Sequence, residues 1–228
     1  MKTKAILVHG AWADGSNWRK VIAALNSRGI DAQAAQIPLT SFADDVAALK
    51  RVVARHRHQP LAIVAHSYAG AVMTEAATHF ANVRSLSYIA GYAPDANETV
   101  LDLRMKNPAH PDSPELKPDQ DGFIWIDWDG ITKGLAHDVT NQDEQRLILA
   151  TQKPIALKCL QEVTTVPAWK SKPSWYLLCE QDRMLSIETQ RFMAERISAR
   201  TTSLGAGHHP LLSHPIEVAD LIAQACSA

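Results

Sequence analysis

The segment Leu61-Ala62-Ile63-Val64-Ala65-His66-Ser67-Tyr68-Ala69-Gly70 joins an apolar run to a serine that is followed by small residues. Such a run predicts a strand of a parallel sheet that is buried on both faces. A serine between this strand and a helix is in the setting of a nucleophile elbow, whose strained turn presents Oγ above the sheet. The turn requires small residues two positions either side, which Ala65 and Ala69 supply. The alternative is a serine that only caps the helix.

Apolar runs elsewhere predict an α/β fold with an open, mostly parallel sheet of about six strands and helices on both faces. Helical patterns separate the runs, and each connection between neighbouring parallel strands is expected to be a right-handed βαβ unit. The expected strands are Ala5–Val8, Leu61–Ala65, Leu86–Ala90 and Trp175–Cys179, with weaker ones at Asp31–Ile37 and Thr201–Leu204, and the expected helices include Trp18–Leu25, Tyr68–His79, Ser186–Ser198 and one that starts at Pro215.

The alternation of strands and helices is interrupted between Asp95 and Pro173, where no strand pair is expected. The sequence therefore predicts an α/β core formed by residues 1–94 and 174–228 and a helical cap insertion at residues 95–173. Within the insertion, helices are expected at Asp143–Thr151 and Ile155–Val163. An insertion at the carboxyl edge of a parallel sheet tends to form a lid, because ligands bind at that edge. An inert elaboration is the alternative.

Composition excludes several classes of protein. The 228 residues include 23 Lys and Arg and 24 Asp and Glu, so the formal net charge is −1 and no basic surface for nucleic acid is expected. No apolar run reaches the ~18 residues of a membrane helix, and the apolar stretch at the N-terminus is too short for a secretory signal. Three cysteines without C-x-x-C spacing indicate free thiols. We therefore expect a cytoplasmic protein without membrane or nucleic-acid partners.

The loop after the first expected strand, His9-Gly10-Ala11-Trp12, predicts an oxyanion hole. A glycine after a strand permits a tight turn that aims backbone N–H groups at a ligand. In this architecture one N–H comes from such a loop and one from the residue after the nucleophile. The expected donors are the N–H groups of Ala11 and Tyr68.

A serine nucleophile needs a histidine base and a carboxylate that orients it. Three histidines compete for the base, and His208 is favoured over His209 and His214 because two glycines precede it in the loop after the last strand. Asp182, on the loop after Trp175–Cys179, is favoured as the acid over Asp95 and over Glu180. No acidic residue accompanies the three histidines at a useful spacing, so no metal site is expected.

These motifs resemble the α/β-hydrolase superfamily, in particular small bacterial esterase-like members related to plant methylesterases and hydroxynitrile lyases. The resemblance covers nearly the whole chain and implies Ser67 as nucleophile, Asp182 as acid, His208 as base, an α-helical cap and a sheet without the family's first two strands. The matching segments are His9-Gly10-Ala11-Trp12-Ala13-Asp14-Gly15-Ser16, Pro38-Leu39-Thr40-Ser41, His66-Ser67-Tyr68, Lys172-Pro173-Ser174-Trp175-Tyr176-Leu177, Asp182-Arg183 and Ser213-His214-Pro215.

Three departures from the family pattern bear on activity. Alanine stands at both elbow positions that are usually glycine. Gly10 replaces the threonine, and His209 the lysine, that hydroxynitrile lyases use to hold a cyanohydrin and favour cyanide release. The loss of both opposes a lyase, although a lyase or lactonase that uses the same triad remains an alternative. A receptor that has retained the hydrolase fold is a second alternative.

The predicted function is a serine hydrolase that cleaves a small, apolar carboxylic ester and requires no cofactor or metal. Its expected partner is a small-molecule ester, and the expected oligomeric state is a monomer or a homodimer. The residues expected to line the substrate pocket are Gly10, Trp12, His66, Trp125, Trp128 and His209.

Overall fold

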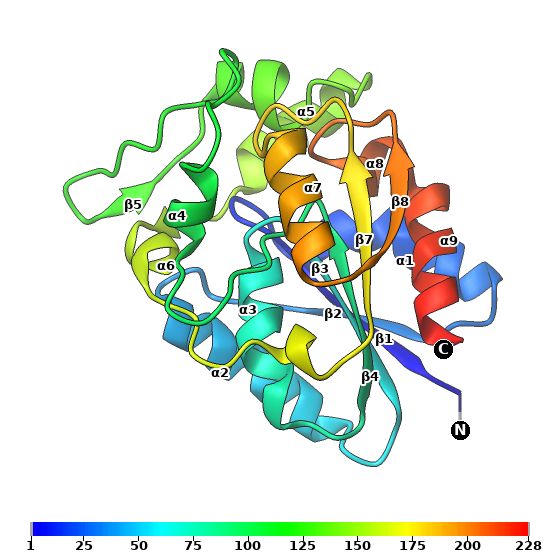
Figure 1. Ribbon diagram of the computed structural model, residues 1–228. Coiled ribbons are helices and arrows are strands. Elements are labelled where there is room, and N and C mark those ends of the chain that lie inside the picture. Colours follow the sequence, from blue (N-terminus) through cyan, green and yellow to red (C-terminus); the bar gives the residue numbers. More distant parts are fainter. Residues whose placement is uncertain (1, 228) are drawn as a thin grey trace.

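Six strands form one sheet in which every neighbouring pair is parallel (Figure 1). The computed structural model describes residues 2–227. The order across the sheet is β2-β1-β3-β4-β7-β8, which confirms the predicted fold class. The strands are β1 (Lys4–Val8), β2 (Ala32–Ala35), β3 (Leu61–His66), β4 (Val83–Ile89), β7 (Ser174–Cys179) and β8 (Arg200–Leu204).

Helices cover both faces of the sheet because side chains of the central strands alternate between two apolar clusters. On β1, Ala5 and Leu7 pack with α1 and α9, whereas Ile6 and Val8 belong to the cluster that includes α2, α3 and α7. This double burial explains the apolar run of β1. The helices are α1 (Arg19–Ser27), α2 (Phe42–Arg55), α3 (Ala69–Ala76), α7 (Ile187–Arg196), α8 (Pro210–Ser213) and α9 (Pro215–Cys226), with 3-10 turns at Gly15–Trp18, Ala77–His79 and Ala168–Lys170.

Residues 95–161 lie over the carboxyl edge of the sheet, and residues 162–173 return beside α3 to the start of β7 (Figure 1). The former hydrogen-bond to the loops that follow three strands: Ile124 O accepts from Trp12 Nε1, Arg104 donates to Met184 O, and Asp138 accepts from the Gly207 N–H. The segment contains α4 (Val100–Arg104), β5 (Phe123–Ile124), a π-helix (Gly130–Leu135), α5 (Gln142–Thr151), β6 (Ile155–Ala156) and α6 (Lys158–Gln161).

Two expectations for this segment were wrong. The helix expected over Ile155–Val163 starts only at Lys158 and ends at Gln161, because Ile155 and Ala156 form strand β6. This strand pairs antiparallel with β5, where no strand pair was expected. A two-residue pair is too short to show alternation, so the sequence carried no signal for it.

Strand β4 begins three residues before the predicted Leu86. Its first part contains Ser85, a residue that interrupts the apolar run. Ser85 is nevertheless fully buried, and its hydroxyl donates to the carbonyl of Ala225 on α9. A buried serine that has a backbone partner is compatible with a core strand.

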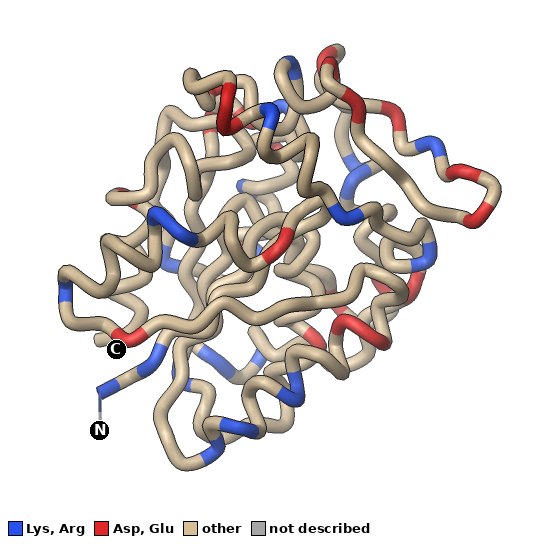
Figure 2. Tube along the Cα trace, turned by 180° about the vertical axis from the view of Figure 1, so that it is seen from behind, with Lys and Arg blue, Asp and Glu red and all other residues tan. Residues whose placement is uncertain are grey.

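Positive and negative side chains are interspersed along the chain (Figure 2). Within residues 2–227, no helix combines the length and apolar character needed to cross a membrane.

Candidate active site

The turn between β3 and α3 holds Ser67 in the left-handed region, with φ 54°. Hydrogen bonds fix this strained residue on both sides: its N–H donates to Ile89 O at 3.1 Å, and its carbonyl accepts the N–H groups of Gly70 and Tyr92 at 3.0 and 3.1 Å. A non-glycine residue with positive φ persists only where its surroundings hold it. The turn has the geometry of a nucleophile elbow.

The loop after β8 brings His208 beside this serine. Its Nε2 lies 2.9 Å from Ser67 Oγ, and its Nδ1 lies 2.7 Å from Asp182 Oδ2. Because a carboxylate only accepts, Nδ1–H donates to Asp182 and Nε2 is left to accept the serine proton. The structure therefore brings Ser67, His208 and Asp182 together in the arrangement of a catalytic triad.

The Asp182 carboxylate has further donors. Its Oδ1 accepts the N–H groups of Met184 and Leu185 at 2.7 and 2.9 Å, and its Oδ2 accepts Gln190 Nε2 at 2.9 Å. These donors fix the orientation of the buried carboxylate toward His208.

The two rival acids are engaged elsewhere. Asp95 forms an ion pair with Lys170. Glu180 is exposed and accepts the Ser203 hydroxyl at 2.7 Å. Neither is among the hydrogen-bond partners of His208 in the described part of the chain.

Ala11 and Tyr68 face the same cavity as Ser67 and His208. Among residues 2–227, neither backbone N–H donates to another protein group. Tyr68 directly follows the serine and precedes α3, where unpaired N–H groups favour negative charge. The two N–H groups are therefore available to a ligand in the cavity.

The cavity beside Ser67 is narrow and mainly apolar. Trp12 lines it, and its Nε1 donates to Ile124 O at 2.9 Å, which connects the cavity wall to β5. Sequence reasoning missed several lining residues that come from the insertion and from the loops after β4 and β7. These residues are Tyr92, Val100, Arg104, Leu116, Ile155, Leu160 and Met184.

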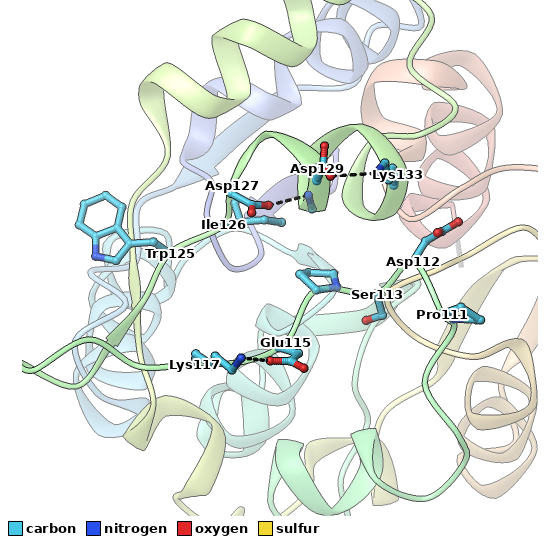
Figure 3. A pocket seen from close by; sticks show the side chains of 12 residues that line it. Pro111, Asp112, Ser113, Glu115, Lys117, Trp125, Ile126, Asp127, Asp129 and Lys133 are labelled. Carbon is cyan, nitrogen blue, oxygen red and sulfur yellow. Dashed lines mark hydrogen bonds and ion pairs between the residues drawn. The ribbon is translucent and has the colours of Figure 1, made fainter.

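Trp125 and Trp128, predicted to line the substrate pocket, are not among the residues that line this cavity. Trp125 is 55% exposed, and its Nε1 donates to Asp119 at 3.0 Å. It lines a separate surface hollow formed by the insertion, together with residues such as Glu115 and Lys133 (Figure 3). Trp128 is half-buried in the same segment.

Gly10, His66 and His209 were also predicted to line the substrate pocket, and they are not among the residues that line the cavity beside Ser67. A Cβ on Gly10 would lie 3.0 Å from the Cβ of Ser67 and 3.2 Å from His66 Nδ1. His66 Nε2 donates to the carbonyl of His208 at 2.6 Å. His209 is buried, with neither ring nitrogen partnered among residues 2–227. Burial lowers the pKa of His209 to about 3 and that of His66 well below its usual value, so both stay neutral.

Within residues 2–227, no group of three or more His, Cys, Asp or Glu side chains is arranged to hold a metal ion. The cysteines Cys159, Cys179 and Cys226 are free thiols.

The chain is similar to known proteins along nearly its whole length. The sequence profile described as "Alpha/beta hydrolase family" matches residues 5–221. The alpha/beta hydrolase nvfD of Aspergillus novofumigatus is 24% identical over 251 residues, covering 99% of this chain and 97% of that protein.

Solved structures of similar shape include three named enzymes. A pyrethroid hydrolase from Sphingobium faniae JZ-2 has a TM-score of 0.83 at 20% identity, covering 99% of this chain and 98% of that one. Polyneuridine aldehyde esterase has a TM-score of 0.85 at 18% identity, covering 98% and 99%. Tomato methylketone synthase I, complexed with 2-tridecanone, has a TM-score of 0.80 at 16% identity, covering 100% and 98%. Likeness at these identities shows a shared fold.

Proposed function

Because the chain belongs to the alpha/beta hydrolase family, we propose that it is a serine hydrolase that cleaves a small, apolar carboxylic ester through an acyl-enzyme on Ser67. The observation that carries this proposal is the hydrogen-bonded series of Ser67 Oγ, the His208 imidazole and Asp182, with distances of 2.9 and 2.7 Å. A series of this kind activates an otherwise weak hydroxyl nucleophile.

In the first half-reaction, Ser67 Oγ bonds to the acyl carbon of the ester while His208 Nε2 takes the serine proton. The resulting tetrahedral oxyanion accepts hydrogen bonds from the N–H groups of Ala11 and Tyr68. Collapse breaks the bond to the alkoxide, which leaves as the alcohol with the proton from His208. Asp182 holds the imidazole in the required tautomer and stabilises its charged form.

In the second half-reaction, His208 takes a proton from a water molecule, whose oxygen bonds to the acyl carbon. The second tetrahedral intermediate collapses, the bond to Ser67 Oγ breaks, and His208 returns the proton to the serine. The carboxylic acid is released. Every proton and leaving group is accounted for by these residues, so the proposed reaction requires neither metal nor cofactor.

The walls of the cavity support a small apolar substrate. Apart from the residues of the reaction, most of the side chains around the cavity are apolar, and those of Val100, Leu116 and Ile155 are aliphatic. An apolar pocket with few polar groups binds apolar ligands by the area it removes from water. Related enzymes such as the pyrethroid hydrolase are named for hydrolysis, which is consistent with this proposal.

A fluorophosphonate probe tests the nucleophile. One covalent addition is expected, on the peptide that contains Ser67, and none in Ser67→Ala. Ser16→Ala, which changes an exposed serine, is the control and should label like the wild type. Labelling that persists in Ser67→Ala would overturn the assignment.

A panel of p-nitrophenyl esters of increasing acyl length tests the reaction and the substrate size. Turnover is expected with short acyl chains and should be lost in Ser67→Ala. If no ester is turned over while an apolar ligand binds tightly, the protein is a receptor and the proposal fails.

A further inference from the structure

Asp45, on α2, is a fully buried carboxylate for which the proposed reaction has no use. A buried charge is costly unless hydrogen bonds compensate it. Asp45 has two close donors: the Tyr68 hydroxyl lies 2.6 Å from its Oδ2, and the Leu39 N–H lies 2.7 Å from its Oδ1. The Cys159 thiol is 3.8 Å from Oδ2.

These donors belong to segments that surround the cavity. Tyr68 supplies one of the two N–H groups available to an oxyanion, and its side chain is 1% exposed. Leu39 has a φ of 63°, and its carbonyl accepts the N–H of Ala156 in β6 at 2.9 Å. Cys159 lies on α6. One carboxylate therefore connects the elbow, the loop before α2 and the insertion.

We propose that Asp45 is a positioning residue of the reaction: by anchoring the hydroxyl of Tyr68, it keeps the backbone N–H of Tyr68 aimed at the developing oxyanion. This inference rests on the proposed function.

The physical reason is that Tyr68 is covalently attached to the strained Ser67, so its peptide plane must be held from outside the turn. The backbone of Tyr68 is helical, with φ −46° and ψ −41°, directly after a serine with φ 54°. The tip of the Tyr68 ring is fixed to α2 by Asp45, and the backbone at the next residues is fixed by α3. An oxyanion donor contributes to rate only when it is preorganised.

Tyr68→Phe tests the inference because it removes the hydroxyl and retains the backbone N–H. Removal of a whole oxyanion donor costs about 10²–10³ in kcat. Tyr68→Phe keeps the donor but holds it less firmly, so the loss should be smaller. We expect kcat to fall about tenfold, while KM for the same p-nitrophenyl ester changes less than twofold. Binding of an alkyl trifluoromethyl ketone, whose serine adduct carries an oxyanion, should weaken by the same factor as kcat.

Tyr88→Phe is the matched control. Tyr88 is another fully buried tyrosine, and its hydroxyl pairs with Thr74 Oγ1 at 2.9 Å, remote from Asp45 in the hydrogen-bond network. The Tyr88→Phe substitution should lower the melting temperature without the tenfold loss in kcat.

Asp45→Asn is the second variant, since it keeps the shape of the side chain and leaves one acceptor oxygen for two donors. It is also expected to lower kcat more than it changes KM.

The inference is overturned if folded Tyr68→Phe or folded Asp45→Asn retains kcat within twofold of the wild type, or if Tyr68→Phe and Tyr88→Phe differ in stability alone. These outcomes leave the proposed function intact. Failure of that function would instead appear as ester hydrolysis that persists in Ser67→Ala.

Discussion

The three residues of the candidate triad lie on three separate loops, and each is held in place by neighbours that take no part in the proposed reaction. Asp182 is the clearest case, because the backbone of Met184 and Leu185 and the amide of Gln190 donate to it in addition to His208. A carboxylate held by four donors cannot rotate away from the imidazole without losing several hydrogen bonds. The orientation of His208 is therefore set by the loop after β7.

The role of Asp182 predicts a large effect of a small substitution. Asp182→Asn should remain folded and lose up to ~10⁴-fold in kcat, because the amide favours the wrong imidazole tautomer. Asp95→Asn and Glu180→Gln should retain kcat within a fewfold, since both side chains are bonded elsewhere. Rates and melting curves of the three variants provide the measurement. A dead but folded Asp95→Asn beside an active Asp182→Asn would contradict the triad.

Adjacent histidines are expected to behave differently. His208→Ala should lose about 10³-fold or more in kcat, because the base is removed. His209→Leu should retain kcat within about threefold, because His209 is buried outside the cavity lining and is neutral. Steady-state kinetics with one ester distinguish the two residues. If His209→Leu shows the larger loss, the base has been assigned to the wrong histidine.

At the scale of elements, the elbow depends on close approach between α3 and the loop after β4. A Cβ added to Gly70 would lie 2.4 Å from the carbonyl oxygen of Tyr92 and 2.8 Å from its nitrogen. Both are backbone atoms, so they cannot move aside as a flexible side chain can. The glycine is needed at this position for contact between backbones, and alanine is accommodated at Ala65 and Ala69.

Gly70→Ala is therefore expected to destabilise the protein by about 3 kcal/mol or more, in the range of strongly strained substitutions. Gly205→Ala is the control, because a Cβ there would meet only Gln181 Nε2, at 3.9 Å. Chemical unfolding of both variants gives the comparison. Equal stability of the two would mean that the elbow can separate from the loop after β4 at little cost.

At the scale of the whole molecule, three buried histidines make folding sensitive to acid. Burial lowers the pKa of His9 to about 4, that of His209 to about 3 and that of His66 well below its usual value. The unfolded chain binds protons on these residues below its His pKa of about 6.5, so their contribution to stability is present above that pH and is lost as pH falls. Burial raises the pKa of Asp45 to about 6, which has the opposite effect between pH 6 and 4.

Near pH 5 the unfolded chain binds about two more protons than the folded protein on these four groups, three more on the histidines and one fewer on Asp45. The free energy of unfolding should therefore fall by about 3 kcal/mol per pH unit as pH decreases around 5. Urea unfolding at a series of pH values measures this slope. His209→Leu should reduce the slope by about one proton, or ~1.4 kcal/mol per pH unit. A free energy of unfolding that is constant between pH 7 and 5 would contradict the prediction.

The parallel sheet and the turn at Ser67 could be predicted from the residues, because both depend on local requirements that a short segment must satisfy. A strand buried on both faces needs a continuous apolar run, such as Leu61–Ala65, and the turn at Ser67 needs small neighbours. The loops that bear Asp182 and His208 could likewise be expected at the carboxyl edge, since each follows a strand.

The side chains that enclose the cavity and the polar groups that are buried could not be predicted in this way, because they depend on contacts between distant segments. Trp125 lies on the surface, whereas Arg104, Leu116 and Ile155 line the cavity. These positions depend on how the insertion packs against loops that are distant in the sequence, as in the hydrogen bond between Trp12 and Ile124. In the sequence, Asp45 is indistinguishable from an ordinary exposed acidic residue in the first turn of a helix. Its burial is tolerable because the Tyr68 hydroxyl and the Leu39 N–H, which come from other segments, donate hydrogen bonds to its carboxylate.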